Sequence, residues 1–337
     1  MNKLLASMRF VAGAIAIMAL LALAAPATAQ QPSSVNPTAS AVKEQQLLDQ
    51  LHTVKGLGTI PDTKSYVLEH PAGREWREFR MGMLPWIGGI AILGMIAVLV
   101  IFYLWRGPMR VKAGFSGNKI LRFDAFERFV HWLTATTFVI LGITGLNISF
   151  GRSLLLPWMG PESFSSWSEW GKYAHNYLSF AFTIGVVLMF LMWVGRNFPT
   201  AADATWVKMG GGMFDKSDST HAPAWKFNAG QKLLYWLVIL ASLAMIISGF
   251  MLLFPFYAGL GVGQMELAEI FHGVVAMLFI SLIVAHIYLG TLGMDGAFDA
   301  MGNGYVDVNW AKEHHNLWYQ EEVASQTSGK AAMHPAE

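Results

Sequence analysis

The sequence predicts an all-α membrane protein, a polytopic helix bundle with five spans in the mature chain. Only 13% of its 337 residues are charged and 54% are hydrophobic, whereas soluble domains carry roughly 25% charged residues. The charged residues are also clustered and leave five long uncharged runs between them. Each run suffices for a span, because a membrane-crossing helix needs about 20 mainly apolar residues.

An apolar segment before the first of these runs has a different character. Lys3 and Arg9 precede the run Phe10–Ala25, and Ala27-Thr28-Ala29 offers a small-residue cleavage site. This layout is typical of a secretory signal peptide, here residues 1–29. The polar segment 30–80 is then expected on the periplasmic side of the membrane.

The five spans follow in order along the rest of the chain. One additional span, 81–105, precedes a four-helix core within residues 106–294, and residues 295–337 form a C-terminal tail. No span is expected to resemble another beyond its apolarity. The uncharged runs are Met81–Trp105, Phe129–Gly151, Tyr173–Gly195, Leu233–Gln264, which is broken near Pro255, and Ile270–Met294.

The distribution of basic residues predicts the orientation, since cytoplasmic loops carry an excess of Lys and Arg. With 30–80 outside, the outward loops hold only Arg152 and Lys172, and the tail 295–337 is cytoplasmic. The inward loops hold Arg106, Arg110, Lys112, Lys119, Arg122, Arg128, Arg196, Lys208, Lys216, Lys226 and Lys232.

The chain contains no cysteine. This excludes disulfides, iron–sulfur clusters held by its own thiolates, and haem attached covalently through a C-x-x-C-H motif. Its net charge is +1, and no basic block indicates a nucleic-acid partner.

Four histidines lie within the membrane-length runs, and their depths sort them into two pairs. His175 and His272 begin their spans near the outer face, whereas His131 begins its span near the inner face. His286 lies 14 residues beyond His272, which on one helix means roughly 21 Å deeper and about 40° around the axis. The expected pairs are therefore His175 with His272 and His131 with His286.

Paired intramembrane histidines indicate a cofactor path. Ionisable residues inside a membrane usually mark an ion, proton or cofactor route, and neutral imidazole is a suitable axial ligand of haem iron. Two pairs at two depths predict two b-type haems, with Gly142, Gly145 and Gly273 as places for close porphyrin approach or for helix packing. A single histidine can instead hydrogen-bond across helices. The remaining histidines are expected in solvent or at interfaces: His52, His70, His221, His314, His315 and His334.

With these residues placed, the chain from about Ile120 to Tyr319 resembles the cytochrome b (gamma) subunit of respiratory formate dehydrogenase. The resemblance rests on the order and spacing of six segments. These are FERFVHW (Phe126–Trp132), KYAHNY (Lys172–Tyr177), KFNAGQK (Lys226–Lys232), IFHG (Ile270–Gly273), AHIY (Ala285–Tyr288) and WAKEHHNLWY (Trp310–Tyr319).

The resemblance implies a membrane-anchoring electron-transfer subunit of a formate:quinone oxidoreductase complex in the bacterial inner membrane. It implies an iron–sulfur (beta) subunit and a molybdenum- or tungsten-containing catalytic (alpha) subunit as partners, with formate oxidised on the latter. It also implies a role in anaerobic respiration, with Asn228, Gly230 and Gln231 lining a quinone site beside His286. Without the resemblance, Asn228 could equally be the residue that caps the helix of the fourth span, so capping stays an alternative to quinone binding.

Three alternatives stay open from the sequence. A cytochrome b subunit of a membrane-bound hydrogenase would share the haems but receive electrons from a different partner. A histidine-relay transporter or proton channel belongs to another class, as does a purely structural anchor without a cofactor.

Overall fold

The computed structural model describes residues 71–255 and 259–333, and it confirms an all-α polytopic fold. Within this part of the chain, five helices are long and apolar enough to cross a membrane. The predicted signal peptide 1–29 and residues 30–70 of the predicted periplasmic segment lie outside the described residues. The five membrane-length helices are Gly73–Arg106, Ala125–Leu154, Pro161–Arg196, Ala229–Leu253 and Val262–Gly290.

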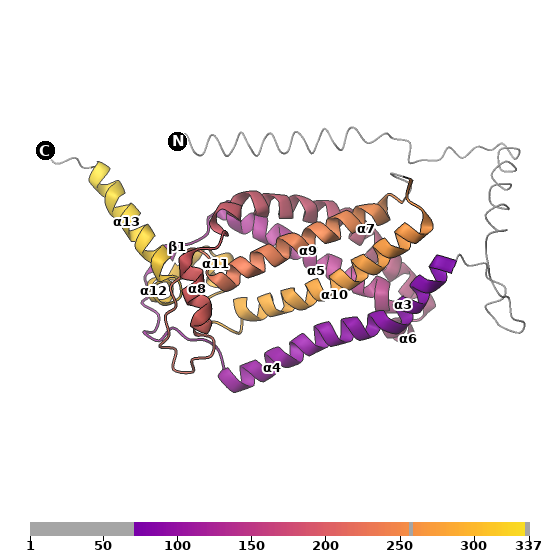
Figure 1. Cartoon of the computed structure of the whole chain (residues 1–337), viewed down its shortest axis with the longest axis horizontal. Coiled ribbons are helices and arrows are strands. Elements are labelled where there is room, and N and C mark those ends of the chain that lie inside the picture. Colours follow the sequence, from indigo (N-terminus) through magenta and orange to yellow (C-terminus); the bar gives the residue numbers. More distant parts are fainter. Residues whose placement is uncertain (1–70, 256–258, 334–337) are drawn as a thin grey trace, which may run out of the picture. The chain divides into compact units, whose positions relative to one another are not determined.

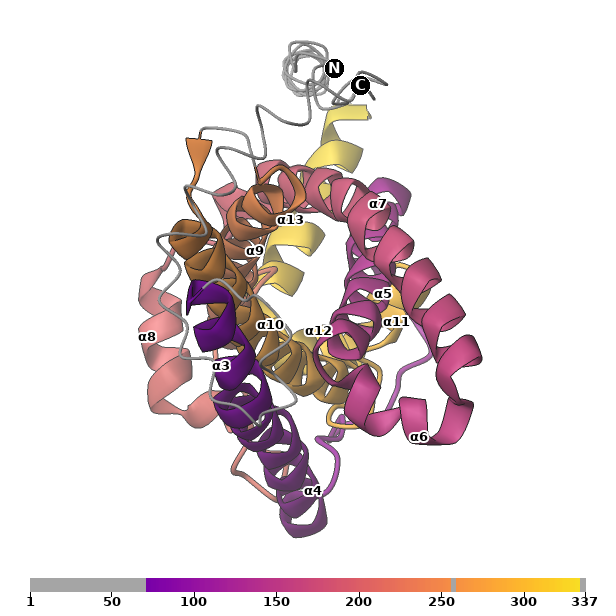
Figure 2. The ribbon, with the colours of Figure 1, turned by 90° about the vertical axis from the view of Figure 1, so that its right-hand side faces the viewer.

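Four of these helices form a closed ring. Helix α5 packs against α7, α7 against α9, α9 against α10, and α10 returns to α5 (Figures 1 and 2). Short connections join α5 to α7 and α9 to α10, and the longer loop 194–228 joins α7 to α9, so that successive helices run in opposite directions (Figure 1). The ring helices are α5 (Ala125–Leu154), α7 (Pro161–Trp193), α9 (Ala229–Leu253) and α10 (Val262–Gly290).

The additional N-terminal span lies outside the ring, against α10 (Figure 2). It comprises α3 (Pro71–Gly88), a π-helical turn η1 (Gly89–Leu93) and α4 (Gly94–Arg106). A π-helical turn frees a backbone carbonyl from the regular helical ladder, and here the hydroxyl of Ser281 on α10 donates to the oxygen of Ala91 at 2.7 Å. The chain is already helical at Pro71, although the uncharged run begins only at Met81.

Leu84 fixes the position of this span. Its side chain is fully buried, and a Cβ atom added at Gly273 of α10 would lie 3.5 Å from it. Gly273 therefore allows the first span to approach α10, which is the helix-packing alternative for this glycine.

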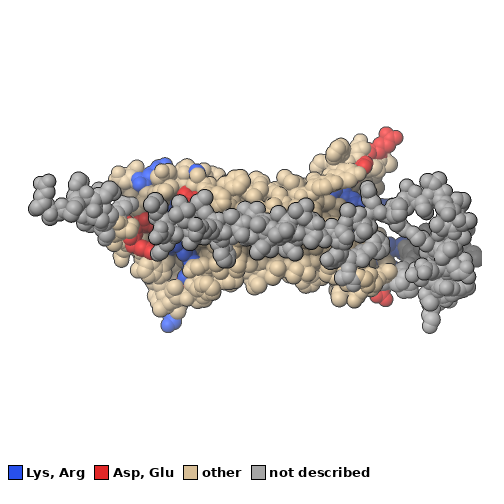
Figure 3. Space-filling view, turned by 90° about the horizontal axis from the view of Figure 1, so that it is seen from above, with Lys and Arg blue, Asp and Glu red and all other residues tan. Residues whose placement is uncertain are grey.

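The surface has the polarity expected of a membrane protein. In Figure 3 the visible charged side chains gather towards the two ends of the molecule, and the band between them is uncharged. Large apolar side chains in this band are exposed, for example Leu104 at 78% and Leu240 at 58%. Such exposure is costly in water but neutral against lipid tails, so the band is suited to a hydrocarbon layer.

One end of the bundle, here called the tail end, carries the residues after α10 together with the loop between α7 and α9 (Figure 1). Strand β1 (Lys119–Leu121) pairs antiparallel with β2 (Tyr305–Asp307), with Ile120 opposite Val306. The remaining elements of the tail end are η2 (Val194–Arg196), α8 (Ala201–Lys208), η3 (Gly210–Gly212), α11 (Asp299–Gly302), α12 (Val308–His314) and α13 (Asn316–Met333). At the opposite end, α6 (Leu156–Met159) joins α5 to α7.

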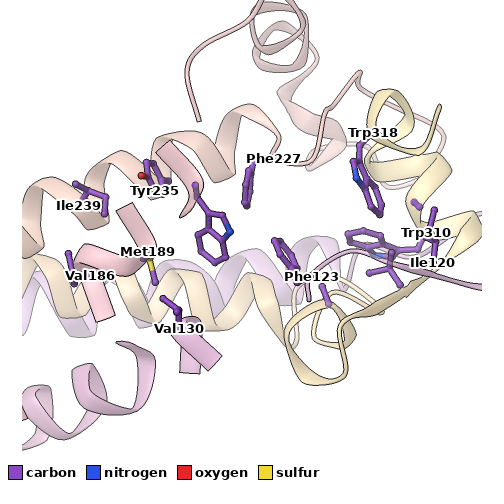
Figure 4. Close-up of a cluster of buried hydrophobic side chains, with 14 of the residues drawn as sticks. Ile120, Phe123, Val130, Val186, Met189, Phe227, Tyr235, Ile239, Trp310 and Trp318 are labelled. Atoms are coloured by element: carbon purple, nitrogen blue, oxygen red, sulfur yellow. The ribbon is translucent and has the colours of Figure 1, made fainter. Parts of the chain in front are cut away.

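A continuous hydrophobic core links the ring to the tail end. Figure 4 shows it running from Val186 and Ile239 inside the bundle to Trp310 and Trp318 at the tail end. Phe123, which precedes α5, lies in the same cluster. The tail up to Trp318 is therefore part of the folded core.

A buried arginine holds this aromatic cluster together. Arg122 is only 4% exposed, lies 4.8 Å from the ring of Trp310, and donates to the carbonyl oxygen of Lys226 at 2.8 Å. Another of its contacts is Nε2 of His315 at 2.9 Å. Burial lowers the pKa of Arg122 to about 9 despite the carboxylate of Glu127, so the guanidinium is charged at neutral pH.

The expectation that His315 occupies solvent or an interface is wrong for the described chain, whereas His314 is partly exposed. His315 is 1% exposed, and its Nδ1 lies 2.6 Å from the carbonyl oxygen of Trp225. Burial and the positive charge of Arg122 hold the pKa of His315 well below its ordinary value, and burial lowers that of His314 to about 4. Adjacent residues do point in different directions, but residues of the loop between α7 and α9 lie beside both histidines.

Replacing Arg122 with methionine is expected to destabilise the protein by about 2–4 kcal/mol, because the ring of His315 and the carbonyl of Lys226 lose their buried donor. The thermal unfolding midpoint in detergent measures this loss, with Arg110→Met as the matched control, since Arg110 is exposed. Equal midpoints for the two variants would contradict a stabilising role for Arg122.

Candidate functional site

The four intramembrane histidines converge as two facing pairs inside the ring. The ring centroids of His175 and His272 are 6.4 Å apart, with the planes at 66°. Those of His131 and His286 are 6.2 Å apart, at 64°. These are the pairs that depth predicts, and α10 contributes one histidine to each.

Hydroxyl groups fix the orientation of the His175–His272 pair. Nδ1 of His175 lies 2.9 Å from Oγ1 of Thr144 on α5, and Nδ1 of His272 lies 2.9 Å from Oγ of Ser248 on α9. With Nδ1 engaged on both rings, the Nε2 atoms are free for another ligand. Each histidine is thus oriented by the helix that precedes its own in the ring.

Glycines next to these hydroxyls make room for the imidazoles. A Cβ atom added at Gly145 would lie 3.3 Å from Cε1 of His175, and one added at Gly249 would lie 3.3 Å from Cε1 of His272. Gly142, by contrast, faces the side chain of Ile280 at 3.8 Å and serves ordinary helix packing.

Sequence reasoning named Gly145 but missed Thr144, Ser248 and Gly249. A signal for them exists in the sequence, because Ile143-Thr144-Gly145 on one span matches Ile247-Ser248-Gly249 on another. The expectation that the spans share nothing beyond apolarity is therefore wrong at this motif.

The His131–His286 pair has a different surrounding. Nδ1 of His131 is buried and has no hydrogen-bond partner among the described residues. The indole of Trp132 lies edge-on to His131, with ring centroids 5.2 Å apart, and its Nε1 donates to the carbonyl oxygen of Met301 at 2.9 Å. The tail end thus closes over this pair.

These donor sets fit haem iron. Two imidazoles on opposite sides of one metal ion have ring centres roughly 6 Å apart, given metal–nitrogen bonds of about 2 Å. Within residues 71–255 and 259–333, no group of three or more His, Cys, Asp or Glu side chains could hold a metal ion. Histidines that occur in pairs suit an ion whose remaining ligands come from a macrocycle, and haem iron is such an ion.

The residues expected to line a quinone site form the start of α9. The side-chain oxygen of Asn228 accepts from the backbone N–H of Gln231 at 2.9 Å, and that of Gln231 accepts from the N–H of Asn228 at 3.1 Å. This reciprocal pair is a capping box. Gly230 lies beneath Trp206, whose ring would be 3.0 Å from an added Cβ atom.

Ion pairs surround the start of α9. Nζ of Lys232 lies 2.7 Å from Asp203, with side-chain exposures of only 6% and 14%, and Nζ of Lys226 lies 2.7 Å from Glu127. Partial burial acts to raise the pKa of Asp203, but hydrogen bonds from Lys232 and Thr200 outweigh it and lower that pKa below its ordinary value. The carboxylate therefore stays ionised at neutral pH and holds Lys232 in place.

Comparison with known proteins adds a family and several relatives. The family model described as prokaryotic cytochrome b561 matches residues 122–304. The nitrate-inducible formate dehydrogenase cytochrome b556(Fdn) subunit of Escherichia coli strain K12 is 25% identical over 207 residues, covering 61% of this chain and 93% of that protein. The formate dehydrogenase cytochrome b556(fdo) subunit of the same strain is 28% identical over 216 residues, covering 64% and 98%. The formate dehydrogenase cytochrome b556 subunit of Haemophilus influenzae strain Rd is 24% identical over 211 residues, covering 62% and 86%.

Gly145→Val is expected to displace His175 and to cost the protein one of its two proposed haems, because the branched side chain would occupy the space of the imidazole. Haem content per chain of the purified protein measures this effect. Gly142→Val is the control on the same helix and should keep the wild-type content. An unchanged haem content in Gly145→Val would contradict the importance of this close approach.

Proposed function

The chain belongs to the prokaryotic cytochrome b561 family, and from that premise we propose that it is the membrane-anchoring dihaem cytochrome b subunit of a formate dehydrogenase. The family implies b-type haem, and the named relatives are subunits of formate dehydrogenases. The complex would oxidise formate on another chain, and this subunit would carry the electrons within the membrane to quinone.

The observation that carries the proposal is the double pairing on α10. The two rings of one pair have centroids 6.4 Å apart, and those of the other pair 6.2 Å apart. Helix α10 contributes one histidine to each pair, and these two histidines are 14 residues apart in sequence. The two sites are therefore roughly 21 Å apart along the helix. His175 and His272 would hold the outer haem, and His131 and His286 the inner haem. When bound, the two haems supply one-electron carriers at two depths between an iron–sulfur subunit outside and quinone near the cytoplasmic face.

The chain's own residues set the conditions for this transfer. Phe279 lies midway between His272 and His286 on α10, and its ring is 4.7 Å from that of Phe138 on α5. An apolar surrounding of this kind excludes water and tunes the potential of a haem. Hydroxyls on α5 and α9 orient the outer imidazoles.

Asn228, Gly230 and Gln231 are proposed to line the quinone site. Their capping box uses the side-chain oxygens and does not involve the side-chain amide nitrogen of Asn228. That N–H group can donate to a quinone carbonyl, so capping and quinone binding are compatible. Proton uptake at the tail end would make the reaction charge-separating, worth about 2.3 kcal/mol per charge per 100 mV.

The proposed orientation places the tail end in the cytoplasm and the His175–His272 end at the periplasm. Partner subunits would then be an iron–sulfur (beta) chain and a molybdenum- or tungsten-containing (alpha) chain on the periplasmic side of the bacterial inner membrane. The positive-inside bias supports this orientation, because the inward loops between the spans hold 11 Lys and Arg residues and the outward loops between the spans hold only Arg152 and Lys172.

A hydrogenase cytochrome b subunit is the second candidate, because paired haem histidines alone do not identify the electron donor. The names of the relatives favour formate dehydrogenase. Co-purifying chains separate the two candidates. A visible spectrum with a reduced b-type band and two haems per chain would argue against a histidine-relay transporter or a cofactor-free anchor, and a colourless protein would refute the proposal.

His286→Ala is expected to lose the inner haem and quinone reduction while the outer haem remains reducible, because the two pairs share no ligand. Haem content should fall from two to one per chain, measured by reduced-minus-oxidised spectra. His221→Ala, at an exposed loop histidine, should keep both haems. Retention of two haems in His286→Ala would contradict the assignment of this ligand.

Asn228→Ser separates capping from quinone binding, since serine is as good a helix cap as asparagine but lacks the amide N–H. We expect wild-type haem content and thermal stability, with quinone reduction slowed by about tenfold for a lost hydrogen bond of ~1.4 kcal/mol. Stopped-flow oxidation of the prereduced protein by a soluble quinone measures the rate. A wild-type rate would leave Asn228 with its capping role alone.

A further inference from the structure

Two side-chain hydroxyls contact the imidazoles of the outer histidine pair. Oγ1 of Thr144 is 2.9 Å from Nδ1 of His175, and Oγ of Ser248 is 2.9 Å from Nδ1 of His272. Thr144 and Ser248 are 5% and 3% exposed, so water does not compete for these contacts.

The direction of these hydrogen bonds follows from counting protons. A hydroxyl has one proton to donate. Thr144 directs its proton at the carbonyl oxygen of Ile140, 2.7 Å away, and Ser248 directs its proton at that of Ala244, also 2.7 Å away. Each hydroxyl therefore accepts from the histidine, and the histidine donates through Nδ1–H.

This direction fixes the tautomer of both rings. A neutral imidazole that carries its proton on Nδ1 has its lone pair on Nε2, which is the atom left for the iron. The hydroxyls thereby keep both outer histidines in the form that can bind metal.

The same bond to the helix's own backbone occurs at hydroxyls that touch no imidazole. Thr137 on α5 bonds to the carbonyl oxygen of Leu133 at 2.7 Å, and Thr183 on α7 bonds to that of Ser179 at 2.7 Å. A hydrogen bond from a hydroxyl to the carbonyl oxygen of its own helix therefore forms without a histidine nearby. Thr144 and Ser248 differ because each faces a histidine and precedes a glycine that admits it.

The inner pair lacks this arrangement at His131, whose buried Nδ1 has no partner within the described part of the chain. A hydrogen bond from the distal nitrogen of a metal-bound imidazole to an acceptor raises the basicity of that ligand. A more basic ligand stabilises oxidised iron over reduced iron, and so lowers the reduction potential.

We propose that Thr144 and Ser248 are positioning residues that hold His175 and His272 as Nε2 ligands and lower the reduction potential of the outer haem relative to the inner one. The inference rests on the proposed function, since it requires haem at both pairs. Because the two hydroxyl groups lower the potential of the outer haem, electron transfer from the outer haem to the inner haem would be downhill.

The test is a redox titration of the purified full-length protein, followed by visible absorbance, for Thr144→Val, Ser248→Ala and the double variant. The midpoint potential of the outer haem should shift upward in each single variant and further in the double variant, while that of the inner haem stays unchanged. Thr144→Ser and Ser248→Thr, which keep a hydroxyl, should restore wild-type potentials. Thr137→Val is the matched control on α5 and should shift neither potential.

The outcomes separate this inference from the proposed function. If the wild-type protein binds no pair of b haems, the proposed function fails and the inference fails with it. If both haems are present and the variant potentials equal those of the wild type, the inference is overturned while the proposed function stands. Loss of the outer haem in Thr144→Val but not in Thr144→Ser would support the holding role, whereas its loss in both would overturn the hydroxyl assignment.

Discussion

The imidazoles inside an apolar bundle are the constraint on which the rest of this structure depends. A polar ring nitrogen removed from water costs free energy unless it has a partner, and each of the four histidines brings two such nitrogens. At the His175–His272 pair, hydroxyls satisfy Nδ1, so the Nε2 atoms are left for another ligand. The hydrogen bonds of this pair tie the register of α5 to that of α7 and the register of α9 to that of α10.

Helix α10 links the two depths of the bundle. Its two histidines lie on nearly the same face because 14 residues are close to four turns of an α-helix. The helix also receives the additional N-terminal span, through Gly273 and through the hydrogen bond from Ser281 to Ala91. One face of α10 therefore serves the interior of the ring, and another serves packing against a helix outside it.

The tail end is built on a different principle from the ring. Its stability rests on aromatic rings around the buried charge of Arg122, and on ion pairs such as Lys232 with Asp203. These contacts join β1, the start of α9 and the tail into one unit beside the His131–His286 pair. The residues proposed for quinone binding thus lie on a rigid helix start, and rigidity is an advantage for a site that must orient a small ligand.

The sequence by itself determined the fold class, the five spans and the pairing of the histidines, because apolar length, charge position and the helical repeat are local properties. It did not determine the partners of Thr144 and Ser248, the packing of Gly273 against Leu84, or the burial of His315. Those contacts join residues far apart in the chain, for example 193 positions between Arg122 and His315. Only the tertiary structure decided them, because which side chains meet across helices depends on the rotation of each helix within the bundle, and no single segment encodes that rotation.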